Sequence, residues 1–127
     1  MRQNYSSGTQ WENEVGYSRA VKVGNSIEVA GTTAFDGEKI VGIGDPYEQS
    51  VFIFNKIKEG IEALGGSLKD VVRTRMYVTN IEEWQEVTKA HSQFFRDIKP
   101  VATMVEVSRL VHPDLLVEIE ATAVLEG

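Results

Sequence analysis

The sequence predicts a single α+β domain in which two helices cover one face of a mixed β-sheet. Residues 46–64 and 80–98 place apolar side chains at helical spacing, whereas the segments around them alternate apolar and polar residues as strands do. The length agrees, because 127 residues are enough for one domain with its own hydrophobic core. The expected element order is β-β-α-β-α-β-β, with both helices packed against one sheet.

The first two strands are predicted to form a hairpin. Residues 17–23 and 26–32 alternate, and the Gly24-Asn25 pair between them accepts the positive φ of a tight turn. Residues 1–15 are polar and show no periodicity, so we expect an N-terminal arm or loop with Trp11 as a candidate anchor. The single domain would then span residues 16–127.

The first helix has the clearest local signals. Asp45 is a capping residue, Pro46 suits the first helical position, and Glu48 stands in the reciprocal capping place. Gly65-Gly66 provides the stop. The apolar stripe expected to face the sheet consists of Val51, Phe54, Ile57, Ile61 and Leu64.

A central strand is predicted from Asp70 to Thr79, and Asn80 is expected to cap the second helix. Alternation assigns one face of this strand to Val72, Thr74, Met76 and Val78, and the other face to Arg73, Arg75 and Tyr77. The apolar stripe of the second helix is Trp84, Val87, His91, Phe94 and Ile98.

The last two strands, 101–110 and 115–124, each combine an apolar face with a polar one. The apolar faces, expected to meet the helices, contain Val105, Val107, Val117, Ile119 and Ala121. The polar faces contain Met104, Glu106, Ser108, Glu118, Glu120 and Thr122. Such a face is either solvated, with cross-strand ion pairs, or a subunit interface with a ligand site. Met104 and Tyr77 among the charges favour the interface.

Composition argues against several classes of protein. Cysteine is absent, which excludes disulfides and thiolate metal sites. The net charge is −6 and the 13 Lys and Arg residues are scattered, which argues against a nucleic-acid partner. No run of about 20 apolar residues predicts a membrane span, and the first residues do not read as a signal peptide, so we expect a cytoplasmic protein.

Two segments resemble the C-terminal signature of the YjgF/RidA (reactive-intermediate deaminase) family. These are residues 100–107, PVATMVEV, and residues 117–121, VEIEA. Gly16-Tyr17, Gly24-Asn25, Ala30-Gly31 and residues 70–78 are also similar to the family, so the resemblance extends from about Gly16 to the C-terminus. It implies a chorismate-mutase-like fold in a homotrimer, with a central barrel and small-molecule clefts between neighbouring subunits. Family members with the full site hydrolyse enamines and imines such as 2-aminoacrylate, and the family needs no cofactor.

The resemblance also implies roles for individual residues. Glu120 matches the glutamate that positions or activates the attacking water, and Tyr17 matches a tyrosine that lines the cleft. Ala30 takes the place of the serine before Gly31, and Thr88 takes that of an asparagine that some members carry. Met104 lies in the same C-terminal motif, on the face expected to line the site.

The departure from the family is at Ala102, where the family has the arginine that clamps the substrate carboxylate. Deamination of simple 2-imino acids is therefore in doubt, and another carboxylate or imine-like metabolite is expected as the ligand. Two arginines are candidate substitutes. Arg19 stands two residues after Tyr17 and is therefore expected on the same strand face, and Arg75 lies on the polar strand face. Alternatively, Arg19 is an exposed edge-strand charge and Arg75 an ion-pair partner of a nearby glutamate.

Histidine and metal chemistry receive little support from the sequence. His91 lies on an apolar helical stripe, where a structural histidine is favoured over a catalytic one. With only two histidines, no metal-ligand spacing is present. The candidate functions are an imine or enamine hydrolase with an altered substrate, a non-catalytic ligand-binding or interaction trimer and, disfavoured by the acidic charge, an endoribonuclease.

Overall fold

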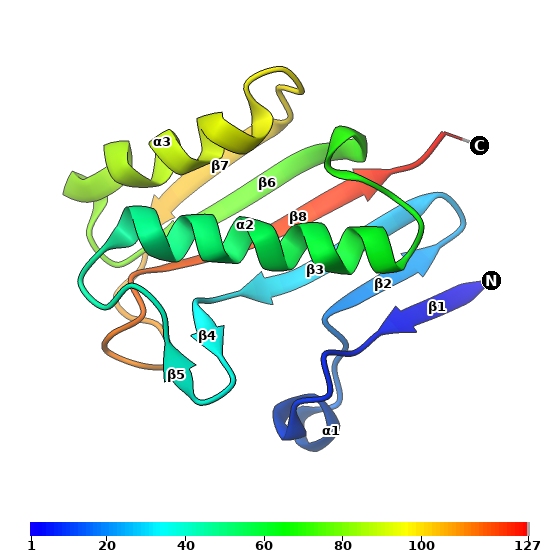
Figure 1. Ribbon diagram of the computed structural model, residues 1–127, viewed down its shortest axis with the longest axis horizontal. Helices are drawn as coiled ribbons and strands as arrows, with labels where there is room; N and C mark the ends of the chain where they lie inside the picture. The colour runs from blue at the N-terminus through cyan, green and yellow to red at the C-terminus, as the bar shows by residue number, and fades with distance from the viewer. Residues whose placement is uncertain (127) are drawn as a thin grey trace.

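The computed structural model describes residues 1–126 and shows a six-stranded sheet with two helices on one face (Figure 1). The strands of this sheet are β1 (Arg2–Tyr5), β2 (Ala20–Val23), β3 (Ser26–Thr32), β6 (Val71–Val78), β7 (Val101–Glu106) and β8 (Val117–Val124). Their order in the sheet is β1-β2-β3-β8-β6-β7, and among the described residues only the β6–β7 pair is parallel. The predicted α+β arrangement with a mixed sheet is confirmed.

The helix α2 (Pro46–Ala63) begins where the capping signals place it. The Asp45 carboxylate accepts a hydrogen bond from the backbone N–H of Glu48 at 3.0 Å, and Pro46 occupies the first turn. After the last turn, Gly65 adopts a φ of 92°, a conformation that glycine accepts without strain. Along the core-facing side, Ile53, Phe54, Ile57 and Ile61 are fully buried.

The second helix, α3 (Trp84–Phe95), starts later than predicted. Asn80 caps the 3₁₀ turn η2 (Ile81–Glu83) by accepting a hydrogen bond from the Glu82 N–H at 3.0 Å, and the α-helix follows that turn. Trp84, expected in the apolar stripe, is 48% exposed because it stands at the junction between the turn and the helix. Val87 and Phe95 are buried against the core.

The N-terminal segment differs from the expected arm or loop. Residues 2–5 form β1, an edge strand that pairs antiparallel with β2, and residues 10–15 form the short helix α1 (Gln10–Val15). Polar composition hid the strand because an edge strand needs backbone pairing and not an apolar face. Trp11 does not anchor the segment within this chain, since its side chain is 65% exposed. The division into residues 1–15 and 16–127 stays a prediction.

A short hairpin and a 3₁₀ turn complete the chain. The hairpin β4 (Phe35–Asp36) and β5 (Lys39–Ile40) forms a separate two-stranded sheet, and η1 (Leu68–Asp70) leads into β6. No helix among residues 1–126 combines the length and the apolar composition required to cross a membrane.

Two β-bulges change which side chains share a face. The register between β6 and β8 shifts between Val71 and Arg73, so that Val71 is buried and Val72 is 45% exposed. The prediction that Val72 faces the core with Thr74 is therefore wrong, because strict alternation does not hold across a bulge. A second shift between Val29 and Thr32 in β3 places Ala30 and Gly31 together opposite Glu120 of β8.

The faces of β7 are the reverse of the prediction. Parallel pairing sets Met104 beside Met76 and Ala102 beside Thr74, and both β6 partners face the buried side of the sheet. Met104 accordingly packs against the core, and Val105, expected to meet the helices, is 43% exposed on the other face. The sequence could not reveal this because both faces of β7 carry apolar residues.

Candidate functional site

An open hollow of about 620 Å³ lies on the face of the sheet that the helices leave uncovered. It is lined by residues of all the strands of this sheet except β7, and by the segment between α1 and β2. The lining residues that matter for chemistry are Tyr17, Arg75 and Glu120, with Ala30 beside them. Four of the residues that the sequence singled out are thus brought together by the fold.

Glu120 is the best-held carboxylate in this hollow. Its Oε1 accepts a hydrogen bond from the Tyr77 hydroxyl at 3.0 Å and lies 3.5 Å from Nη1 of Arg75. The arrangement follows from strand register, because Arg75 is paired directly with Glu120 and Tyr77 is one pleat further along β6. About a third of the Glu120 side chain remains accessible, so one face of the carboxylate is available to water or ligand.

Tyr77 acts in this cluster as a hydrogen-bond donor. The hydrogen bond to Glu120 raises the pKa of the Tyr77 hydroxyl, because removal of its proton would place two negative charges together, and burial raises this pKa further. The phenol therefore stays protonated at neutral pH. It orients the carboxylate and limits the positions from which Glu120 can accept another proton.

Glu118 is a member of the cluster that sequence reasoning did not select. It stands two residues before Glu120 on the same face of β8 and is half-buried. Burial raises the pKa of the Glu118 carboxyl, and the charge of Glu120 raises it further, whereas Arg19 opposes both effects. Strand alternation predicts that Glu118 and Glu120 share one face of β8, but the burial of Glu118 depends on the neighbouring strand β3.

The bulge in β3 explains the burial of Glu118. A Cβ on Gly31 would collide with Oε2 of Glu118, so the carboxylate occupies the space that a side chain at position 31 would fill. Because Ala30 and Gly31 both face β8 within the bulge, the backbone approaches the two glutamates closely. Gly31 contributes to the site through its lack of a side chain.

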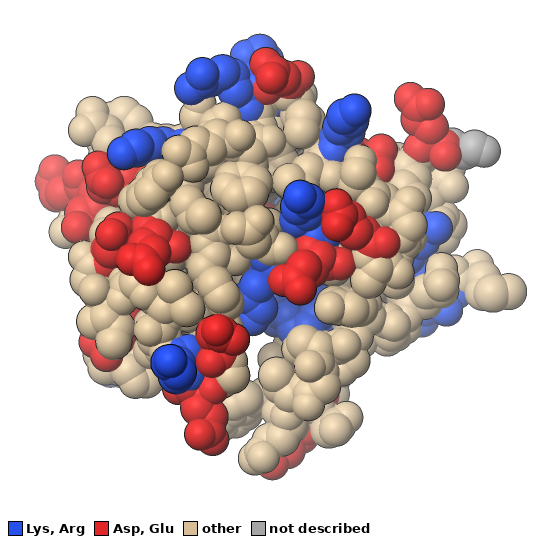
Figure 2. Space-filling view, viewed as in Figure 1, with Lys and Arg blue, Asp and Glu red and all other residues tan. Residues whose placement is uncertain are grey.

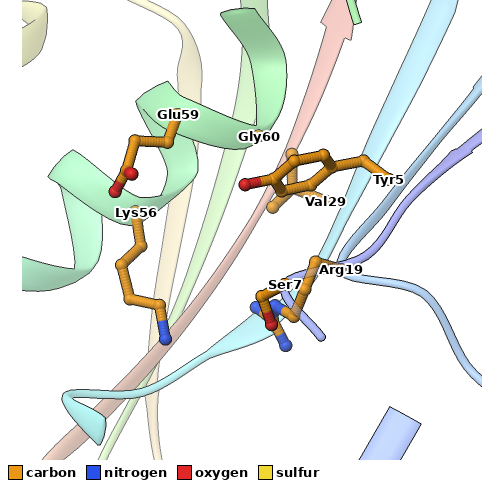
Figure 3. A pocket seen from close by; sticks show the side chains of 7 residues that line it. All are labelled: Tyr5, Ser7, Arg19, Val29, Lys56, Glu59 and Gly60. Carbon is orange, nitrogen blue, oxygen red and sulfur yellow. The ribbon is translucent and has the colours of Figure 1, made fainter. Parts of the chain in front are cut away.

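Arg19 does not point into the hollow that Tyr17 and Glu120 line. Its guanidinium donates hydrogen bonds to the Gly31 carbonyl at 3.2 Å and to the Thr32 hydroxyl, and it lines a different hollow beside α2 (Figure 3). The expectation that Tyr17 and Arg19 share a face fails because Tyr17 precedes β2, where regular alternation has not begun.

Three further predicted residues lie elsewhere. Thr88 is on α3, where its hydroxyl donates to the Gln85 carbonyl at 3.1 Å, and Ala102 and Met104 are on β7. Ala102 and Met104 belong to the helix-covered side of the sheet. Within one chain the sheet separates this group from Glu120, and only a second copy could bring the two groups together.

The structure gives His91 a packing role. Its Nε2 lies 2.9 Å from the Thr74 hydroxyl, and its ring packs edge-on against Phe54 and 4.9 Å from the centre of Phe95. Burial lowers the pKa of His91, which favours the neutral ring. Within residues 1–126, no three His, Asp or Glu side chains are grouped so that they could hold a metal ion.

Comparison with known proteins agrees with this architecture. Residues 8–125 match the family model described as Endoribonuclease L-PSP. An uncharacterized protein of Streptomyces coelicolor is 38% identical over 117 residues, which cover 92% of this chain and 87% of that protein. A RutC family protein of Pyrococcus abyssi is 41% identical over 112 residues, covering 87% of each chain.

A solved structure gives the same result. The crystal structure of a Mycobacterium tuberculosis member of the YjgF/YER057c/UK114 family superposes with a TM-score of 0.88 at 46% identity, over 98% of this chain and 100% of that one. Sequence signature, family model and fold therefore agree, and this chain belongs to the YjgF/RidA family.

Proposed function

We propose that the hollow around Glu120 binds a small imine or enamine metabolite and hydrolyses its carbon–nitrogen bond. The observation that supports this proposal best is the Glu120 carboxylate, which Tyr77 and Arg75 hold at the floor of an open hollow lined by Tyr17. A partly accessible carboxylate in a fixed orientation is suited to accept a proton from water.

The chemistry needs only one water and one proton acceptor. Water attacks the carbon of the protonated imine, the electron pair of the C=N bond moves to nitrogen, and Glu120 takes the proton that the water loses, which gives a neutral carbinolamine. Glu120 then returns this proton to the nitrogen. The carbon–nitrogen bond breaks as the C=O bond forms, and the hydroxyl proton leaves with the ammonia as ammonium. An enamine enters the same sequence after a proton from water adds to its β-carbon and gives the protonated imine.

The substrate is expected to differ from a simple 2-imino acid. The residue at position 102 is alanine, so it offers no charge to a carboxylate. Two arginines line the hollow: Arg2 is exposed on the edge strand β1, and Arg75 contacts Glu120 directly, so a substrate carboxylate at Arg75 would have to share it. We therefore expect little ammonia release from 2-aminoacrylate and a substrate whose anionic group, if it has one, lies nearer to Arg75.

Two other functions are compared with this proposal. A non-catalytic ligand-binding trimer is favoured by the contacts of Glu120 with both Arg75 and Tyr77, because they occupy part of the carboxylate and leave fewer positions from which water can reach it. Endoribonuclease activity, named in the family description, is less favoured. The net charge is −6, and on the face seen in Figure 2 basic side chains lie in small groups with acidic ones beside them and form no extended patch.

The proposal includes a homotrimer in the cytoplasm with its sites between subunits. Thr88, Ala102 and Met104 of one copy would then face Tyr17 and Glu120 of another, which would reunite the two groups that the sheet separates within one chain. The cytoplasmic location rests on the sequence alone.

The test is an ammonia-release assay of the wild type and Glu120→Gln with a panel of acyclic and cyclic imines, including freshly generated 2-aminoacrylate. We expect turnover of at least one imine and a loss of about 100-fold or more in Glu120→Gln, the range that removal of a general base produces. Glu62→Gln, which changes an exposed glutamate of α2 outside this hollow, is the matched control. Substrate binding without turnover would support the non-catalytic alternative, and equal turnover in both proteins would refute the role of Glu120.

A further inference from the structure

A second hollow, of about 90 Å³, lies beside α2 on the helix-covered side of the sheet. Figure 3 shows that its polar groups come from three parts of the chain. Tyr5 lies in β1, Arg19 immediately precedes β2, and Lys56 and Glu59 lie in α2. Val29 of β3 lines both hollows, but none of these polar residues contributes to the hollow of Glu120. The second hollow therefore differs from the site proposed above in all of its polar groups.

Two half-buried cations line this hollow, and neither has a carboxylate within ion-pair distance; Glu118 attracts Arg19 only at longer range. Arg19 donates only to neutral oxygens, those of Gly31 and Thr32, and Lys56 donates to the Phe35 carbonyl at 3.1 Å. Among residues 1–126, Arg75 and Glu120 form the only ion pair with a nitrogen–oxygen distance within 4.0 Å. Neither Arg19 nor Lys56 is therefore neutralised by direct contact with a carboxylate. Half-buried charges of one sign are costly to keep together in this way.

The electrostatics show that the two cations affect each other. Burial lowers the pKa of the Lys56 ammonium, and the charge of Arg19 lowers it further; Asp36, Glu59 and Glu12 counteract this at longer range. Glu59 is exposed, and in Figure 3 its carboxylate lies at the opposite side of the hollow from the ends of Lys56 and Arg19. Glu12 is occupied by hydrogen bonds from Ser7 and Thr9.

We propose that this hollow is a binding site for a compact oxyanion, a carboxylate or phosphate group held between Arg19 and Lys56. The Arg19 guanidinium has further N–H donors beyond those it uses, and Lys56 supplies a second positive charge. The Tyr5 hydroxyl points into the same space as an additional donor (Figure 3). The volume is several times the ~10–15 Å³ that one water needs, so a small oxyanion fits and a nucleotide does not.

The test is an NMR titration of the full chain with inorganic phosphate in one arm and acetate in the other. We expect saturable shifts at Tyr5, Arg19 and Lys56, and a rise in the pKa of Lys56 when the anion binds, because a negative charge favours the ammonium form. Tighter phosphate binding would identify a phosphate site and tighter acetate binding a carboxylate site, and either result supports the proposal.

Variants make the result specific. Lys56→Gln and Arg19→Gln should each weaken binding by roughly tenfold or more, equivalent to ~1.4 kcal/mol. Lys58→Gln, an exposed lysine on the same helix, and Glu120→Gln in the other hollow should bind as the wild type does. If Arg19→Gln is destabilised by loss of its bonds to β3, Lys56→Gln still decides the question. The proposal is overturned if the wild type shows no saturable binding, or if Lys56→Gln binds equally well.

Discussion

At the scale of single residues, the site depends on which carboxylate is positioned and which is buried. Glu120 is held by Tyr77 and Arg75, whereas Glu118 fills the space left by Gly31 and keeps its proton to higher pH. Two glutamates one pleat apart on the same strand therefore differ in environment. Glu120 is oriented toward the hollow by its two partners, whereas burial disfavours the charged form of Glu118.

Replacement of Ala102 tests whether the two groups of site residues meet between subunits. In one chain Ala102 lies on the helix-covered side of the sheet, away from Glu120. Ala102→Arg should therefore create pyruvate binding only if a second copy supplies Tyr17 and Glu120. Calorimetry with pyruvate should show binding at least about tenfold tighter than wild type, ~1.4 kcal/mol.

The control for Ala102→Arg is Val23→Arg, which adds the same charge at an exposed position of β2. It should leave pyruvate binding as weak as in the wild type. Glu120→Gln combined with Ala102→Arg separates capture of the new guanidinium by Glu120 from loss of the site. Unchanged binding in both Ala102→Arg proteins would contradict a site that spans Ala102 and Glu120.

At the scale of elements, the packing of α2 and α3 on the sheet determines the role of His91. The ring lies between Phe54 and Phe95 and reaches the Thr74 hydroxyl of β6, so it links both helices to the central strand. Protonation would place a charge in this contact. The histidine therefore makes the packing of these elements sensitive to pH.

Stability is expected to fall as the pH falls because burial lowers the pKa of His91 in the fold. As the pH falls, the unfolded chain binds the proton first, near the ordinary histidine pKa of about 6.5. The contribution of neutral His91 to the free energy of unfolding is therefore fully present above that pH and is lost as the pH falls below it. Urea unfolding at about pH 8 and about pH 5 should show this loss. In His91→Gln, which keeps a polar group near Thr74 without a titration in this range, the loss should be smaller.

His112→Gln is the matched control, since the chain has only these two histidines. Its Nδ1 accepts a hydrogen bond from the Asp114 N–H in a turn, away from the α2–α3 contact. It should therefore lose stability with falling pH as the wild type does. A pH dependence that is the same in all three proteins would show that His91 is not responsible.

At the scale of the whole molecule, one chain leaves a sheet face and two sheet edges without cover. β1 and β7 are the edge strands, and the face away from the helices exposes apolar side chains among its charges. These are Tyr17, Val72, Val101 and Val105, at 38%, 45%, 56% and 43% exposure. Surfaces of this kind are typical of contacts between subunits.

We therefore expect the protein to form a trimer in solution. Light scattering over a range of micromolar concentrations should give a mass about three times that of the 14.2 kDa chain. A mass that stays at one chain throughout this range would contradict the trimer, and the Ala102→Arg prediction would then fail with it. A stable dimer would contradict the threefold arrangement but not the contact between copies.

By itself, the sequence determined the features that depend on near neighbours in the chain. The start of α2 follows from Asp45 and Pro46, and its buried side follows from a 3.6-residue repeat. The same holds for the family signature around Glu120, which is read directly from adjacent residues. These signals need no knowledge of the rest of the fold, because a cap or a periodicity acts within one or two turns.

The tertiary structure alone decided which side chains meet. The parallel pairing of β7 placed Met104 in the core, the bulge in β3 buried Glu118 against Gly31, and the path before β2 turned Arg19 into the second hollow. Each of these depends on register between strands distant in the sequence. A shift of one residue reverses a strand's faces, and that register is set by the pairing and packing of the whole sheet and not by the residues of one strand.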